Sequence, residues 1–312
     1  PDRFAPPHAP SIRKSRQGPG RNDLGNTRQD DGDEDGALQA YAEASSHRPD
    51  WAVPWYNAGL IHKYRGDWAA SLEANARAVQ CDPGNEGAVW NLGIAATALG
   101  DWTTARRAWR LYGIPLAEGE GPVDHFAGLT PIRVHGDEAS EVLWADRIDP
   151  ARAILRNVPL PGSGHRYGDL VLHDGAPNGY RLHQGREVAV FDALALIAPS
   201  DYATFELWIE EASQDEIDIL IARFHAVGDG AENWSLGIRM LCAACSEGRP
   251  YGDGEGHEHP ADQTVGPRGP WRLGLATRGE AAARALLDDW QREHPAAAPR
   301  DLRCVLAAAP RS

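Results

Sequence analysis

Residues 241–260 read "LCAACSEGRPYGDGEGHEHP", with two cysteines three positions apart and two histidines two positions apart at opposite ends of a glycine-rich stretch. Thiolates and imidazoles are the ligands that Zn²⁺ prefers, and two of each complete its tetrahedron. The intervening chain is long enough to fold back and bring all four side chains to one point. The spacing therefore predicts a zinc site with the ligands Cys242, Cys245, His257 and His259.

Four protein ligands would leave no open coordination position, so the zinc is expected to be structural. Replacement of one ligand by water would instead make the metal catalytic, with Glu258 as a candidate base. Two further interpretations stay open. One is a redox pair, although a reactive Cys-x-x-Cys motif usually begins a helix, and the other is a loop that binds no metal.

A repeat with a period of 34 residues occupies residues 35 to 113. The segments "GDWAASLEANARAVQCDP" and "GDWTTARRAWRLYG" begin 34 residues apart, and the segments before them place Asn57 with Asn91 and Gly59 with Gly93. This pattern resembles the tetratricopeptide repeat (TPR), in which two helices cross closely at small residues. The leading helix of the first unit is expected to be missing or degenerate, because only Leu24 and Gly25 fall in phase.

The resemblance implies a docking surface for a protein or peptide, lined by the leading helix of each pair. The residues at matching positions are Tyr56, Asn57, Leu60, Lys63, Tyr64, Trp90, Asn91 and Ile94. The two asparagines share one phase, so their amides are expected to hydrogen-bond the backbone of an extended peptide. Alternatively, the asparagines cap or bridge helices, or the β-rich region fills the groove of so short an array.

Residues 1–33 are rich in Pro, Gly, Arg and Asp without apolar periodicity, which predicts a disordered tail before the repeats at 34–118. Residues 121–200 contain short β-rich runs separated by Asp-Gly, Asn-Gly and Pro-Gly-Ser-Gly, which predict a small antiparallel meander or barrel. The expected fold class is multidomain α+β, completed by residues 201–312.

Residues 201–312 alternate strand and helix patterns in the order βαββαβ, which resembles the ferredoxin-like arrangement. The expected strands are "TFELWIE", "WSLGIRML", "WRLGLAT" and "DLRCVLA", and Ser213 with Glu216 forms a capping box before the first helix. The cysteine and histidine stretch, residues 242–260, would be an insertion between the second and third strands.

The composition limits the kinds of partner that the protein can bind. The net charge of −14 would repel nucleic acid and anionic membranes. No run approaches the ~20 apolar residues of a membrane span, and the first thirty residues lack a signal-peptide core, which together predict a cytoplasmic protein. The near-exclusive use of Arg over Lys points to a GC-rich, bacterial genome.

These observations together predict a protein- or peptide-binding adaptor of the TPR type, carrying a structural zinc site, rather than an enzyme. The alternative is a metal-dependent enzyme or sensor in the carboxy-terminal half, recruited through the helical array. The two interpretations differ in whether the metal keeps an open coordination position.

Overall fold

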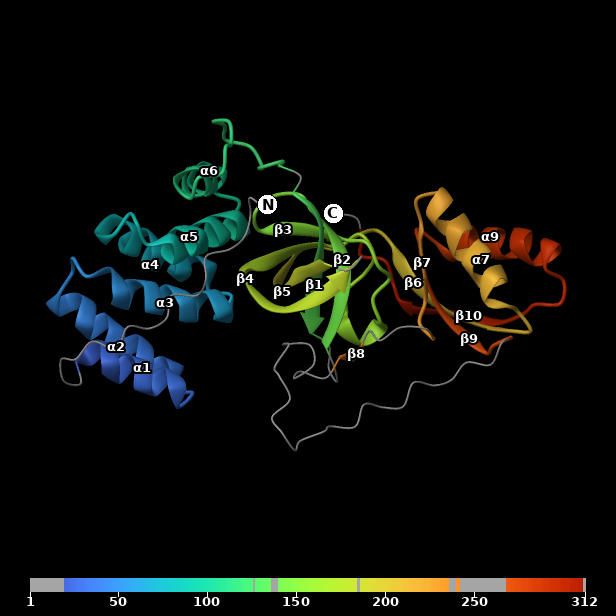
Figure 1. Cartoon of the computed structure of the whole chain (residues 1–312), viewed down its shortest axis with the longest axis horizontal. Helices are drawn as coiled ribbons and strands as arrows, with labels where there is room; N and C mark the ends of the chain where they lie inside the picture. The colour runs from blue at the N-terminus through green and yellow to red at the C-terminus, as the bar shows by residue number, and fades with distance from the viewer. Residues whose placement is uncertain are drawn as a thin grey trace. The chain divides into compact units, whose positions relative to one another are not determined.

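The computed structural model describes residues 20–125, 127–135, 140–183, 186–235, 240–241 and 268–310 (Figure 1). The chain divides into two compact units. The first comprises Pro1–Ala127, Ile148–Ala151 and Asp174–Ala176, and the second comprises Gly128–Arg147, Arg152–His173 and Pro177–Ser312. Helices and two mostly antiparallel sheets occur together, which confirms a mixed α+β chain.

The first unit contains six helices within its described residues, arranged as three consecutive hairpins (Figure 1). They are α1 (Arg21–Asp30), α2 (Glu34–His47), α3 (Ala52–Arg65), α4 (Trp68–Cys81), α5 (Glu86–Leu99) and α6 (Trp102–Leu111). This array fits a TPR-like arrangement. The prediction of disorder up to residue 33, and of a missing first helix, is wrong for the residues of α1.

Each hairpin closes around a glycine at the same phase of the repeat. A Cβ atom at Gly25 would overlap the ring of Tyr41, and one at Gly93 would overlap the ring of Trp109. In the middle hairpin, a Cβ atom at Gly59 would overlap the Asn75 side chain. Tyr41 is fully buried. Because the α1 sequence is mostly polar, this tertiary contact, rather than apolar periodicity, places α1 against α2.

The second unit begins with strands that close into a barrel. They are β1 (Gly128–His135), β2 (Ser140–Arg147), β3 (Arg152–Leu155), β4 (Leu170–His183) and β5 (Arg186–Ala198). Neighbouring strands pair antiparallel, and a parallel pairing of β1 with β5 closes the ring. Ile132, Leu143 and Leu155 are buried in its core. The predicted antiparallel, β-rich character of this region is confirmed.

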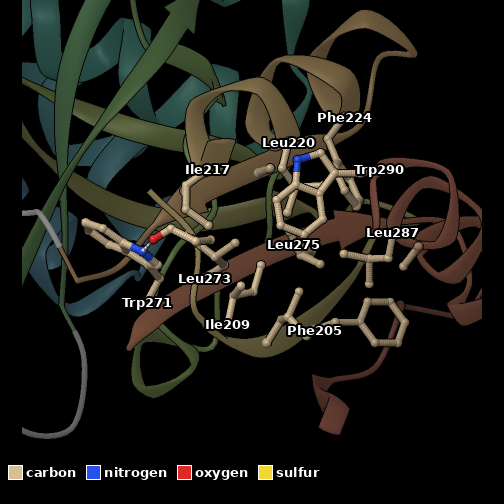
Figure 2. Packing of buried hydrophobic residues seen from close by; sticks show 14 of the residues in the cluster. Phe205, Ile209, Ile217, Leu220, Phe224, Trp271, Leu273, Leu275, Leu287 and Trp290 are labelled. Atoms are coloured by element: carbon tan, nitrogen blue, oxygen red, sulfur yellow. Dashed lines mark hydrogen bonds between the residues drawn. The ribbon is translucent and has the colours of Figure 1, made fainter. Parts of the chain in front are cut away.

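The second sheet of this unit contains β6 (Ala203–Glu210), β7 (Gly230–Asn233), β9 (Trp271–Thr277) and β10 (Ala298–Leu306). The strands lie in the order β10-β6-β9-β7 with antiparallel neighbours. One hydrophobic cluster joins them to α7 (Gln214–Ala226) and α9 (Glu280–Glu293), as Figure 2 shows. The capping box is present, since the Ser213 N–H donates to the Glu216 carboxylate and the Glu216 backbone N–H donates to the Ser213 hydroxyl oxygen.

The position predicted for the second strand of this sheet is wrong. The strand that pairs with β9 is β7, which begins four residues before the "WSLGIRML" segment. Met240–Leu241 forms β8 and pairs with β2 of the barrel instead. The alternation in that segment indicated a strand but could not identify its partner, because pairing depends on residues distant in sequence.

Within the described part of the chain, no helix is long and apolar enough to cross a membrane.

Candidate functional site

The site is centred on Lys63, near the end of α3. Lys63 is only 3 % exposed. Its Nζ donates to both carboxylate oxygens of Asp174, at 2.9 Å each. The Tyr64 hydroxyl donates to Oδ2 of the same carboxylate at 3.0 Å. Two buried opposite charges with this geometry make a strong, directional contact, because little water competes for either group.

Asp174 reaches this position through a bulge in β4. The ladder between β4 and β5 pairs His173 with Ala193 and next pairs Pro177 with Phe191, so the register shifts across Asp174–Ala176. Such bulges redirect side chains away from the sheet. Oδ1 of Asp174 also accepts the backbone N–H groups of Gly175, at 2.7 Å, and of Ala176, at 3.3 Å.

The strand beyond the bulge is fixed by a buried ionic network. Arg133 donates to the Asp192 carboxylate at 2.6 Å and to the Asn178 carbonyl oxygen at 2.7 Å. The Asn178 amide donates to the other oxygen of Asp192, also at 2.6 Å. The Arg133 side chain is 2 % exposed. Because each of these contacts involves a charge or a backbone carbonyl, the network holds Asn178 in one conformation.

Gly175 lies against Trp90 of α5, close enough that a Cβ atom there would overlap the indole ring. Trp90 is 3 % exposed and is held edge-on by Trp109 and Tyr112, with ring centroids 5.0 and 4.7 Å away. A residue with a side chain at position 175 would need to move one of these rings. The Asp174–Ala176 segment is therefore contacted through both its carboxylate and its backbone.

Tyr56 lies about two helical turns before Lys63 and is half-buried. Its burial, with a smaller contribution from the negative charge of Asp174, raises the pKa of Tyr56 above its usual value. Tyr56 therefore stays protonated at neutral pH and keeps a hydroxyl that can donate a hydrogen bond.

Asn57 connects α3 to the first helix. Its amide donates to Oδ1 of Asn26 at 3.1 Å and to Oδ1 of Asn22 at 3.4 Å. The hydroxyl of Tyr41 donates to the same Asn26 oxygen at 2.8 Å. Asn91, one repeat later, is 5 % exposed. The structure therefore shows Asn57 bridging helices, and the two asparagines do not present an exposed pair of amides.

The remaining predicted residues divide by helix. On α3, Leu60 is half-buried and Tyr64 is 57 % exposed, whereas Ile94 on α5 is fully buried. The structure thus brings Tyr56, Lys63 and Tyr64 close to Asp174, and Trp90 against the neighbouring Gly175. It places Asn91 and Ile94 in the interior. Sequence reasoning missed Asp174, because its "HDGAPNG" context indicated only a hairpin turn.

The four predicted zinc ligands, Cys242, Cys245, His257 and His259, lie outside the described residues. Within the residues that the structure does describe, no group of three or more His, Cys, Asp or Glu side chains could hold a metal ion.

A depression lies over α4 and α6. Its apolar lining includes Leu72, Val79 and Leu111. Arg106 at its rim is already engaged, since its guanidinium donates to the carbonyl oxygens of Ala117, Gly121 and Pro122. Arg110 in the lining is paired with Glu118, so the site around Lys63, with its buried ion pair, is the better-defined candidate.

Comparison with known proteins gives a limited result. No family model matches the chain, and no curated protein matches it. Among solved structures, the chain is similar to the second TPR of Spaghetti (RPAP3) bound to the HSP90 peptide SRMEEVD, at 18 % identity and a TM-score of 0.28. The match covers 30 % of this chain and 85 % of that one. A similarity this low carries no inference about the ligand of this chain.

Proposed function

We propose that this protein is a protein- or peptide-binding adaptor whose helical array takes the partner on its α3 and α5 side. The observation that supports this most is that the array already holds a piece of polypeptide. Asp174–Ala176, more than a hundred residues from α3, is contacted through its side chain by Lys63 and through its backbone by Trp90.

The energetics of the contact favour recognition over stability. Burying a lysine and an aspartate costs several kcal/mol of desolvation for each ion, and well-packed apolar residues are often at least as stabilising. What a buried pair adds is a demand for one complementary charge at one position. A site of this kind suits a surface that distinguishes between polypeptide segments.

The proposed architecture has three parts, which are the helical array from α1 to residue 118, residues 121–200 and residues 201–312. The last part is proposed to be ferredoxin-like. Its support is the element sequence β6-α7-β7-β9-α9-β10 with both helices in one cluster with the sheet. The zinc site at Cys242, Cys245, His257 and His259 also remains a proposal, and it rests on residue type and spacing alone.

Metal analysis of the purified protein tests the zinc proposal. About one zinc per chain is expected, together with its loss in Cys242→Ser. Zinc that is absent from the wild-type protein, or that is unaffected by the substitution, would refute the proposed ligand set.

Selection from a random peptide library displayed on phage, against the immobilised full chain, tests the adaptor proposal. Enriched peptides are expected to bind the double variant Lys63→Met with Asp174→Asn about tenfold or more weakly than Asp174→Asn alone, the scale of one charge-assisted hydrogen bond. The matched control is Arg77→Met, which removes an exposed cation from α4 and should leave binding unchanged. A library without enrichment, or peptides insensitive to Lys63→Met, would count against the proposal.

A further inference from the structure

We propose that the site around Lys63 recognises an Asp-Gly dipeptide, and that Asp174-Gly175 is an internal ligand which a partner carrying the same dipeptide displaces. This inference rests on the proposed function and adds the chemistry of the ligand and a means of regulation. Lys63 contacts the Asp174 position and Trp90 contacts the Gly175 position, so the two requirements can be tested separately.

The first position requires a carboxylate. The Lys63 Nζ is equidistant from both Asp174 oxygens, and the Tyr64 hydroxyl adds a second donor to Oδ2. An asparagine here would turn its N–H₂ group toward the Lys63 ammonium, which cannot accept a hydrogen bond. It would also leave the buried Lys63 cation without its counter-charge.

The second position requires a glycine. Any Cβ at position 175 would overlap the Trp90 indole, and that ring cannot move freely because Trp109 and Tyr112 hold it edge-on. An alanine in a competing peptide would meet the same obstacle. Overpacking of this kind should lower the affinity by about 5- to 140-fold.

The dipeptide carries its own conformation. The Asp174 carboxylate accepts the N–H groups of Gly175 and Ala176, which is the local turn that aspartate commonly forms with the residues after it. These two hydrogen bonds lie within three residues. A short peptide or a loop of another protein can reproduce them.

Release of the segment from the array does not require the β4–β5 ladder to break. The ladder pairs His173 with Ala193 and next pairs Pro177 with Phe191, so Asp174–Ala176 lie outside the regular pairing. The hydrogen bonds that join Arg133, Asp192 and Asn178 lie beyond the bulge. They can persist when the Asp174–Ala176 segment leaves the array. An internal ligand competes at a high effective concentration, so it lowers the apparent affinity for any peptide in trans. Weakening Asp174 should therefore raise that affinity.

The test uses a fluorescently labelled peptide with the sequence of residues 172–178, Leu-His-Asp-Gly-Ala-Pro-Asn. Two control peptides replace the Asp by Asn or the Gly by Ala. Their binding to wild type, Asp174→Asn and the double variant Asp174→Asn with Lys63→Met is followed by fluorescence anisotropy, and the folded state of each protein by circular dichroism.

The Asp174→Asn protein is expected to bind the Asp-Gly peptide about tenfold or more tightly than wild type does. It should prefer this peptide over both controls by a similar factor, and the double variant should lose the preference. Equal affinity for the three peptides, or no binding by a folded Asp174→Asn protein, would overturn the proposal.

Gly175→Ala provides a second route to the same test if Asp174→Asn does not fold. The added Cβ should expel the internal segment from Trp90 while the recognition site keeps Lys63 and Tyr64, so peptide affinity should again rise. Failure of this inference is distinguishable from failure of the adaptor proposal. Peptides from the display experiment that depend on Lys63 but lack Asp-Gly would refute only the specificity proposed here.

Discussion

The helical array and the helix-covered sheet of β6, β7, β9 and β10 are stabilised in opposite ways. In the array, each hairpin depends on a glycine that admits one large or polar side chain, as Gly93 admits Trp109. In the sheet layer, large side chains from both helices and three strands fill one cluster (Figure 2). The array is therefore limited by how closely its helices approach, and the sheet layer by how completely its interior is filled.

This difference fits different roles. A close-packed array of hairpins fixes the positions of α3 and α5, so that Lys63 and Trp90 can contact a segment at two defined points. A filled apolar cluster does not fix the position of a polar group in this way. The two regions should respond oppositely to added and to removed volume.

The largest expected effect is the removal of a large side chain from the sheet layer. Phe224 of α7 is fully buried in the cluster, and Phe224→Ala should lower the free energy of unfolding by about 3–5 kcal/mol. The control on the same helix is Ile219→Ala, at a residue that is 43 % exposed, with an expected change of about 0.5 kcal/mol or less. Urea denaturation of both variants measures the difference, and equal losses would contradict the described packing.

A smaller loss is expected when volume is added to the array. Gly93→Ala should destabilise by about 1–3 kcal/mol, because overlap with Trp109 outweighs the higher helix propensity of alanine. The atoms that overlap belong to the outer edge of the six-membered ring, which phenylalanine does not reach. In a double-mutant cycle, Trp109→Phe should therefore recover part of the loss. Purely additive effects would show that the two residues do not touch.

Removing a helix cap should destabilise the helical array and the sheet layer by similar amounts. Asn85 caps α5 by accepting the Ala88 N–H, and Ser213 caps α7 by accepting the Glu216 N–H. Asn85→Ala and Ser213→Ala should each cost about 1 kcal/mol, since both remove one side-chain acceptor from an unpaired helical N–H. Thermal denaturation checks this, and a loss confined to one region would mean that the caps are not equivalent.

The last effect appears only at alkaline pH. Burial, with a smaller contribution from Asp30, raises the pKa of Tyr41 from 10.0 to about 12. Because the folded state holds this proton more tightly than the unfolded state, the stabilising contribution is complete below pH 10.0 and is lost as the pH rises through about 12. The phenolate absorbance of wild type minus that of Tyr41→Phe should titrate near the higher value. A midpoint near 10.0 would place Tyr41 in solvent.

Features that depend on local spacing could be predicted from the sequence. The partners of strands and helices that are distant in sequence could not. The period of 34 follows from the regular spacing of successive helical hairpins, and the Ser213–Glu216 capping box from spacing along one helix. Both appear in the structure. Helix α1 was missed because its polar sequence depends on Gly25 meeting Tyr41, a tertiary contact. The second strand of the sheet was misplaced for the same reason, since β8 finds its partner in β2.

The candidate site shows the same limit. The phase of the repeat placed Lys63 and Tyr64 on α3 together, and the structure brings both to one carboxylate. Nothing in the spacing could assign that carboxylate to Asp174, which arrives through a bulge in a strand of the barrel. The burial of Asn91 and Ile94 likewise depends on packing that the repeat pattern does not encode.

The most direct measurement is amide hydrogen exchange of the full-length Asp174→Asn protein, with and without saturating Asp-Gly peptide. Binding at the array predicts slower exchange within Ala52–Arg65 and Glu86–Leu99, and unchanged exchange in the strands from Ala203 to Leu306 that the structure describes. Unchanged exchange in the two helices, or slower exchange only in the sheet layer, would contradict a binding role for the helical array.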